Sequence, residues 1–99
     1  MFVIDCTILH EEVTDFVFDQ LSDAEDVECN YEEQTIFVDT GDFRSVQEYK
    51  TEVHNLAQER VNDLQRDFDS GYSPDGISEV EVEIEQDILL REEFEISAK

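Results

Sequence analysis

Residues 45–68 read SVQEYKTEVHNLAQERVNDLQRDF, the clearest helical pattern in the chain. Its apolar side chains recur every three or four residues, which places them along one face of a helix. They are Val46, Tyr49, Val53, Leu56, Ala57, Val61, Leu64 and Phe68. Ser45, with Glu48 three residues later, forms a capping box, the signature of a helix N-terminus. We therefore predict a long helix that begins at Ser45 and ends near Phe68.

Shorter elements are predicted on both sides of this helix. Before it we expect a buried strand at residues 2–9, a helix from His10 to about Leu21, a strand at residues 26–31, a hairpin loop at residues 32–34 and a strand at residues 35–39. Turn signals follow at residues 69–76. Residues 78–85 then alternate strictly between Glu and apolar side chains, which predicts a half-exposed strand. Residues 88–96 fit either a last strand or a short helix.

This order of elements predicts a single acidic α+β domain over residues 1–99. It matches the ferredoxin-like βαββαβ pattern with an additional C-terminal strand. In that arrangement two helices pack on one face of a small antiparallel sheet, and the opposite face stays open. We expect Glu79, Glu81, Glu83 and Glu85 to form a row of carboxylates on the open face.

The charge of the chain excludes several functions. It holds 28 Asp and Glu against 6 Lys and Arg, a formal net charge of −22. A protein with this charge does not bind a phosphate backbone, and anionic membranes repel it. No apolar run is long enough to predict a membrane span, and residues 1–13 lack the basic region of a signal peptide. With only two Cys and no such signal, we expect reduced thiols and a cytoplasmic location.

The acidic residues are concentrated in particular segments. Residues 1–43 hold 13 Asp and Glu and no Lys or Arg. So much charge destabilises a compact fold through self-repulsion, and solubility does not require it. Carboxylates repeat at about 6–7 Å on alternate residues of a strand or every fourth residue of a helix, which is close to two nucleotide steps. The predicted partner-binding residues are Glu11, Glu12, Asp15, Asp19, Asp23, Glu25, Asp26, Glu28, Glu32, Glu33, Glu79, Glu81, Glu83 and Glu85.

In size and charge the whole chain resembles phage-encoded DNA mimics, which are small acidic inhibitors of restriction enzymes, uracil-DNA glycosylase or CRISPR effectors. The resemblance rests on composition over the full length and on no family motif, so it assigns no residue roles. It implies a stoichiometric inhibitor that occupies the basic nucleic-acid-binding groove of a DNA-processing protein. Electrostatic steering would make its association fast and sensitive to salt.

Patterns for catalysis or cofactor binding are missing from the sequence. No phosphate-binding glycine loop, G-x-S-x-G or H-E-x-x-H is present, so we expect no enzyme, cofactor or metal. His10 and His54 are expected to be solvated, and Cys6 and Cys29 to be core thiols on strands that are not neighbours. Residues 67–79 begin with the D-x-D of a calcium loop, but they lack its Gly at position 6 and Glu at position 12, which favours an ordinary turn.

Two alternative functions fit the same composition. A halophilic cytosolic protein would be acidic as an adaptation to salt, although three Ala and three Gly against seven Ile and seven Phe is not the small-residue composition expected there. An acidic adaptor or immunity-type protein would bind one basic partner through a local hot spot of aromatic residues. The candidates for that hot spot are Phe18, Phe37 and Phe43. An exposed sheet edge or a bare sheet face would also make a homodimer easy to form.

Overall fold

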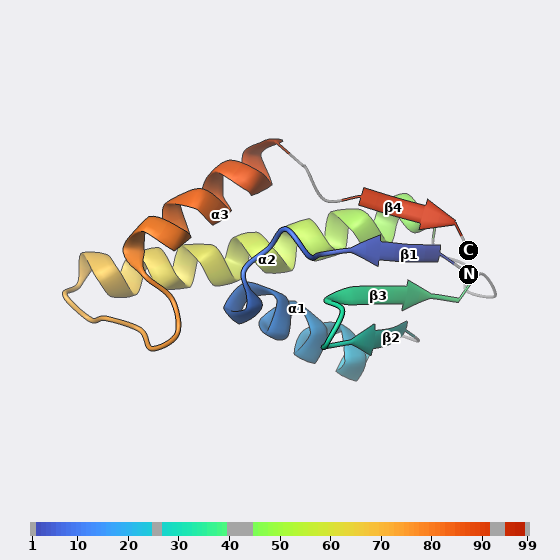
Figure 1. Ribbon diagram of the computed structural model, residues 1–99, viewed down its shortest axis with the longest axis horizontal. Coiled ribbons are helices and arrows are strands. Elements are labelled where there is room, and N and C mark those ends of the chain that lie inside the picture. Colours follow the sequence, from blue (N-terminus) through green and yellow to red (C-terminus); the bar gives the residue numbers. More distant parts are fainter. Residues whose placement is uncertain (1, 25–26, 40–44, 92–94, 99) are drawn as a thin grey trace.

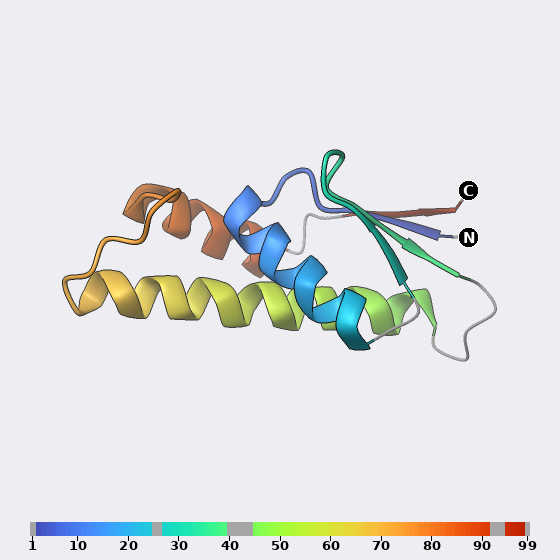
Figure 2. The same ribbon diagram turned by 90° about the horizontal axis from the view of Figure 1, so that it is seen from below.

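The computed structural model describes residues 2–24, 27–39, 45–91 and 95–98. They form β1 (Phe2–Asp5), α1 (Glu11–Ala24), β2 (Val27–Asn30), β3 (Thr35–Val38), α2 (Val46–Asp69), α3 (Glu79–Arg91) and β4 (Glu95–Ala98). The strands make one antiparallel sheet in the order β2-β3-β1-β4. Helices α1 and α2 lie on the same face of that sheet, and α3 lies beside α2 beyond the ends of the strands (Figures 1 and 2).

The long helix predicted from residue 45 is confirmed as α2. Ser45 is its N-cap, and the Ser45 hydroxyl accepts a hydrogen bond from the backbone N–H of Glu48 at 3.2 Å. The helix ends in a Schellman motif, in which Gly71 has a φ of 88° and the N–H of Tyr72 donates to the carbonyl of Asp67. The buried residues all belong to the predicted apolar stripe: Tyr49, Val53, Ala57, Val61 and Leu64.

The first predicted helix is also confirmed, but α1 buries a wider face than its spacing predicts. The helical spacing of Val13, Phe16, Val17 and Leu21 predicts the apolar face. Phe18, outside that face, is nevertheless fully buried, whereas Phe16 within it is only half-buried. The Phe18 ring meets the ring of Tyr31 edge to face, with centroids 5.1 Å apart. Because α2 covers one side of α1 and the β2–β3 hairpin another, the buried arc exceeds a single stripe. The prediction of Phe18 as an exposed partner-binding aromatic is therefore wrong.

The first three predicted strands are confirmed at shorter lengths. β1 ends at Asp5, because the Asp5 carboxylate accepts hydrogen bonds from the backbone N–H and the hydroxyl of Thr7 and turns the chain. At the hairpin between β2 and β3, Gln34 has a positive φ of 51°. Its side-chain amide donates to the Leu9 carbonyl at 3.0 Å and to the Thr14 hydroxyl at 3.1 Å. These bonds hold the hairpin against the start of α1.

The prediction of a strand at residues 78–85 is wrong. Ser78 caps α3, and the residues that follow it form the first turns of that helix. The Ser78 hydroxyl accepts from the backbone N–H of Glu81 at 3.2 Å, and the Glu81 carboxylate accepts from the N–H of Ser78 at 2.9 Å. This reciprocal capping box starts a helix. Val82 and Leu89, seven residues apart on one side of that helix, are then both fully buried. The buried residues of this segment therefore follow the period of a helix, and not the alternate positions of a strand.

The predicted ferredoxin-like arrangement is not confirmed. Two helices, rather than one, separate β3 from the last strand, and the strand beside β1 is β4 rather than residues 78–85. Residues 88–96, for which helix and strand both fit, supply the end of α3 and the start of β4. The coarser prediction, a small antiparallel sheet with helices in one α+β fold, is confirmed.

The two faces of the sheet differ in what covers them. Ile36 and Val38 are buried in the core with the helices, whereas Phe37 between them lies on the opposite face, beside Val3. Phe37 is half-buried there. No helix of the described residues covers that face (Figure 2). Of the other two candidates for an aromatic hot spot, Phe37 thus lies on the face of the sheet opposite the helices, and Phe43 lies outside the described residues.

Candidate protein-binding surfaces

Carboxylates form a row along the exposed side of α1. They are Glu11, Asp15, Asp19 and Asp23, each four residues from the next. Such residues rise along a helix by about 6 Å per step. Asp15 is half-buried and the other three are exposed. Glu12 lies beside the row, with its carboxylate 3.9 Å from the guanidinium of Arg60 on α2.

The hairpin extends this acidic row beyond the helix. The Tyr31 hydroxyl donates to the Asp19 carboxylate at 2.9 Å, while the Tyr31 ring packs against the buried Phe18. Glu32 and Glu33 follow in the hairpin loop, and both are exposed. We define the α1–hairpin surface as Glu11, Glu12, Asp15, Asp19, Asp23, Glu32 and Glu33. The buried side of α1 and the contacts of Tyr31 give this surface a fixed shape.

The α1–hairpin surface carries charges of one sign. Burial raises the pKa of Asp15, and the carboxylate of Glu11 adds to that rise. The hydrogen bond with Asp19 is the main cause of a raised pKa for the Tyr31 hydroxyl. The sequence has no Lys or Arg before residue 44, and every described Lys and Arg belongs to α2 or α3. Within the described ranges, the cation beside this surface is Arg60 at Glu12, so the surface as a whole stays strongly negative.

Glu28, another of the predicted partner-binding acids, is not part of this surface. Glu28 is exposed on β2, but Val27 and Cys29 on either side of it pack against the core. Since side chains alternate along a strand, Glu28 points to the opposite face of the sheet. Glu25 and Asp26 lie outside the described residues.

The predicted row of glutamates at residues 79–85 does not form. Alternate residues lie on nearly opposite sides of a helix, so α3 separates them into two pairs. Glu79 and Glu83 are exposed, whereas Glu81 is half-buried. Glu85 is only 2% exposed, so its prediction as a partner-binding residue is wrong.

Glu81 and Glu85 instead join α3 to the start of α1 through His10. The Glu85 carboxylate accepts a hydrogen bond from the backbone N–H of His10, and its second oxygen is buried with no hydrogen-bond partner among the described residues. The His10 Nε2 lies 3.3 Å from the Glu81 carboxylate, and its Nδ1 accepts from the N–H of Glu12. Burial, reinforced by Glu81, raises the pKa of Glu85 to about 7.

Sequence reasoning missed this contact, although a signal for it was present. His10 is half-buried and engaged with its neighbours, so the prediction that it is solvated is wrong. The spacing Ser78-x-x-Glu81 indicates a helix N-terminus. Had that signal been preferred over the alternation, Glu85 would have been placed one turn after Glu81, on the same side of a helix.

The other histidine and the two cysteines serve the fold. His54 Nε2 lies 3.1 Å from the carbonyl of Leu89, in the last turn of α3, where backbone carbonyls lack helical partners. Cys6 is buried and Cys29 is half-buried, and both are free thiols, as predicted. Burial raises the pKa of Cys6 to about 12 and that of Cys29 to about 11. Both thiols therefore stay protonated near neutral pH, where a cysteine nucleophile needs a thiolate.

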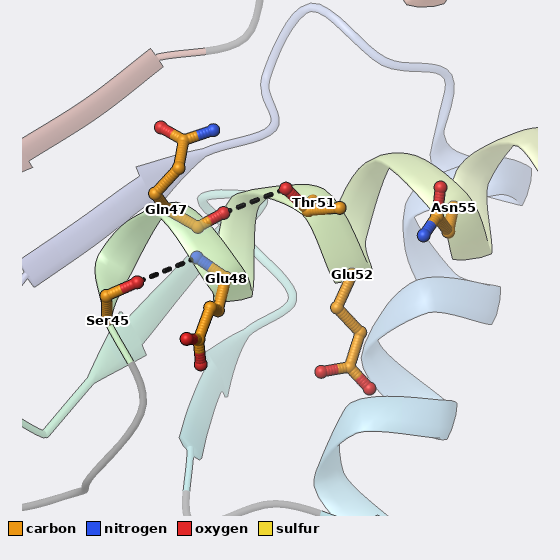
Figure 3. A pocket seen from close by; sticks show the side chains of 6 residues that line it. All are labelled: Ser45, Gln47, Glu48, Thr51, Glu52 and Asn55. Atoms are coloured by element: carbon orange, nitrogen blue, oxygen red, sulfur yellow. Dashed lines mark hydrogen bonds between the residues drawn. The ribbon is translucent and has the colours of Figure 1, made fainter.

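An open hollow lies along the first half of α2 (Figure 3). The described residues that line it are Ser45, Gln47, Glu48, Thr51, Glu52 and Asn55. Its two hydroxyls serve the helix, since Ser45 caps it and Thr51 donates to the Gln47 carbonyl at 3.0 Å. Within the described ranges, no three His, Cys, Asp or Glu side chains are grouped to hold a metal ion.

Comparisons of this chain with family models, with curated proteins and with solved structures found no match. None of the helices in the described residues is long and apolar enough to cross a membrane. The assignment of a function therefore rests on the chemistry of the surface.

Proposed function

We propose that this protein is a DNA-mimic inhibitor that occupies the basic nucleic-acid-binding groove of a restriction, CRISPR or other DNA-processing protein. The α1–hairpin surface is the observation that carries this proposal. Its helical row repeats carboxylates at about 6 Å, close to two phosphate steps along one DNA strand. A groove that holds Lys and Arg for phosphates would accept these carboxylates in their place. The protein acts by occupying the groove, without chemistry of its own.

The packing of α1 favours this mode of binding. The helix is buried on one side by α2 and the hairpin, so its backbone needs little ordering when a partner binds. Tyr31 ties the hairpin to Asp19, which keeps Glu32 and Glu33 in the same rigid unit as the row. The net charge of −22 steers a basic partner toward the surface and makes the association rate fall with added salt.

Affinity capture followed by DNA competition tests the proposal. The tagged protein is immobilised, exposed to a bacterial lysate and eluted with a salt ramp, and the captured proteins are identified by mass spectrometry. We expect a nucleic-acid enzyme in the intermediate-salt fractions, and we expect duplex DNA to displace it. Capture of nothing, or only of partners that ignore added DNA, contradicts the proposal. A chain that folds only in molar salt would instead identify a halophilic protein.

Two variants of equal charge locate the contact. The first neutralises the row with Glu11→Gln, Asp15→Asn and Asp19→Asn, and the amide oxygen that replaces the Asp19 carboxylate can still accept from the Tyr31 hydroxyl. The matched control neutralises three exposed acids away from α1, with Glu59→Gln, Asp69→Asn and Glu83→Gln.

Both variants change the net charge equally, so a long-range effect of charge weakens them equally. We expect the row variant to lose the captured enzyme and the control to keep it. Equal loss in both variants would show that net charge, rather than the α1–hairpin surface, drives the binding.

A further inference from the structure

The outer side of α3 carries an apolar row that the described fold does not use. Val80, Ile84 and Ile88 are four residues apart, so they follow one line along the helix at about 6 Å per step. Val80 is 64% exposed and Ile84 is 54% exposed, and Ile88 lies half-buried at the edge of the core. Exposed apolar side chains that adjoin one another, unlike scattered ones, mark interaction sites.

The inner side of α3 already supplies the packing of this helix. Val82 and Leu89 are fully buried there, in the same core as Val61 and Leu64 of α2. Val80 and Ile84 make no part of that core. Replacing either with a polar residue would therefore cost the fold little, and a fold selected only for its own stability has no need of them.

An acidic row flanks the apolar one. Glu79, Glu83 and Asp87 each precede a residue of the apolar row by one position, and all three are exposed. Arg91, in the last turn, lies 3.1 Å from the Asp87 carboxylate, so the first two turns of the helix hold the unbalanced charge. The outer side of α3 thus offers an apolar strip bordered by carboxylates.

We propose that the outer side of α3 is a docking site for a basic amphipathic helix of a partner protein. Apolar side chains at every third or fourth position of such a helix would cover Val80 and Ile84, and Lys or Arg beside them would meet Glu79 and Glu83. A second copy of the chain does not fit, because it would bring together two molecules of −22 with carboxylates along both helices. This contact is separate from the α1–hairpin surface and stands without the proposed DNA mimicry.

Two synthetic peptides of equal composition test the docking site. One is a helix of about 18 residues with Leu along one face and Lys flanking it, and the other has the same residues with Leu spread around the helix. Both carry the same charge, so electrostatic attraction to the acidic protein is common to them. We expect the full chain to bind the amphipathic peptide about tenfold tighter, with the difference kept in high salt, where ion pairs are screened.

Alanine variants test whether the difference in affinity between the two peptides arises from α3. Val80→Ala with Ile84→Ala removes the apolar strip and keeps good helix formers. Tyr72→Ala removes an equally exposed apolar side chain from the loop before α3 and is the matched control. We expect the α3 variant to bind both peptides equally and the control to keep the tenfold preference, with far-UV circular dichroism confirming that both fold.

Three results would overturn the docking site. They are equal binding of the two peptides by the unmodified chain, a preference that survives in the α3 variant, and a dimer of the chain in sedimentation that the α3 variant abolishes. The row variant on α1 separates this proposal from the proposed function, since neutralising Glu11, Asp15 and Asp19 leaves the peptide preference unchanged. The two proposals can therefore fail independently.

Discussion

The buried carboxyl group of Glu85 makes a quantitative prediction about stability and pH. Its pKa rises from 4.5 to about 7 on folding, because the side chain is withdrawn from water and Glu81 lies close to it. A carboxyl group with a raised pKa binds its proton more tightly in the folded state. Its contribution to stability is therefore complete below pH 4.5 and is lost as the pH rises through about 7.

The substitution Glu85→Gln removes this pH dependence. The Gln amide oxygen can still accept the hydrogen bond from His10 that the Glu85 carboxylate accepts now. At about 1.4 kcal/mol per pKa unit, the shift corresponds to a loss of about 3 kcal/mol of stability at pH 8 and about 1 kcal/mol at pH 5. We therefore expect the stability advantage of the variant over the unmodified protein to grow by about 2 kcal/mol between pH 5 and pH 8.

Urea unfolding followed by far-UV circular dichroism measures the difference at constant ionic strength. The difference between variant and unmodified protein is the relevant quantity, since the other acids of the chain titrate in both. Glu83→Gln, on the exposed side of the same helix, controls for the loss of one charge. A Glu85→Gln protein that is no more stable than the unmodified one at pH 8 would refute the reasoning, because Glu85 would then be ionised and well solvated in the fold.

Three smaller effects follow from other contacts. Ser78→Ala removes the hydroxyl that caps α3 and should cost about 1 kcal/mol in urea unfolding, whereas Ser78→Thr keeps the cap. Gln34→Ala loses two amide hydrogen bonds and keeps the positive φ of 51°, so it should be less stable than Gln34→Gly, which relieves the backbone, by about 1 kcal/mol. The melting temperature should rise between about 0.01 M and 0.1 M salt, because screening over about 10 Å weakens the repulsion along α1; a melting temperature that falls would contradict this.

Local patterns were sufficient to predict α1, α2 and the hairpin. In α2 the cap at Ser45 and the apolar stripe agree with each other, and no other period competes with them. The acidic row of α1 followed from the same helical period, so its residues could be predicted as neighbours before the structure was known. These features depend only on residues within a few positions of one another.

The structure of α3 and the orientation of Glu28 depend on distant residues. The alternation at residues 79–85 is typical of a strand and competes with the helix signal of the capping box at Ser78 and Glu81. Packing beside α2 favours the helix, because Val82 and Leu89 then both reach the core. The burial of Glu85 depends in turn on His10, 75 positions away in the chain. Likewise, Glu28 faces away from α1 because its strand turns Val27 and Cys29 toward the core. The local patterns do not show that Glu85 is buried against His10, or that α1 covers the face of the sheet opposite Glu28.

The arrangement of side chains on α3 is itself an argument for a binding role. A helix that served only to complete the core would place an apolar residue at position 85 and polar residues at positions 80 and 84. The chain has the reverse, with Glu85 buried and Val80 and Ile84 exposed. Proteins break such local rules mainly where function requires it. Both departures are unfavourable for the isolated chain. The buried Glu85 destabilises the fold at neutral pH, and the exposed Val80 and Ile84 favour aggregation with other apolar surfaces. A partner that covers Val80 and Ile84 would remove the second effect, which explains why these positions are apolar.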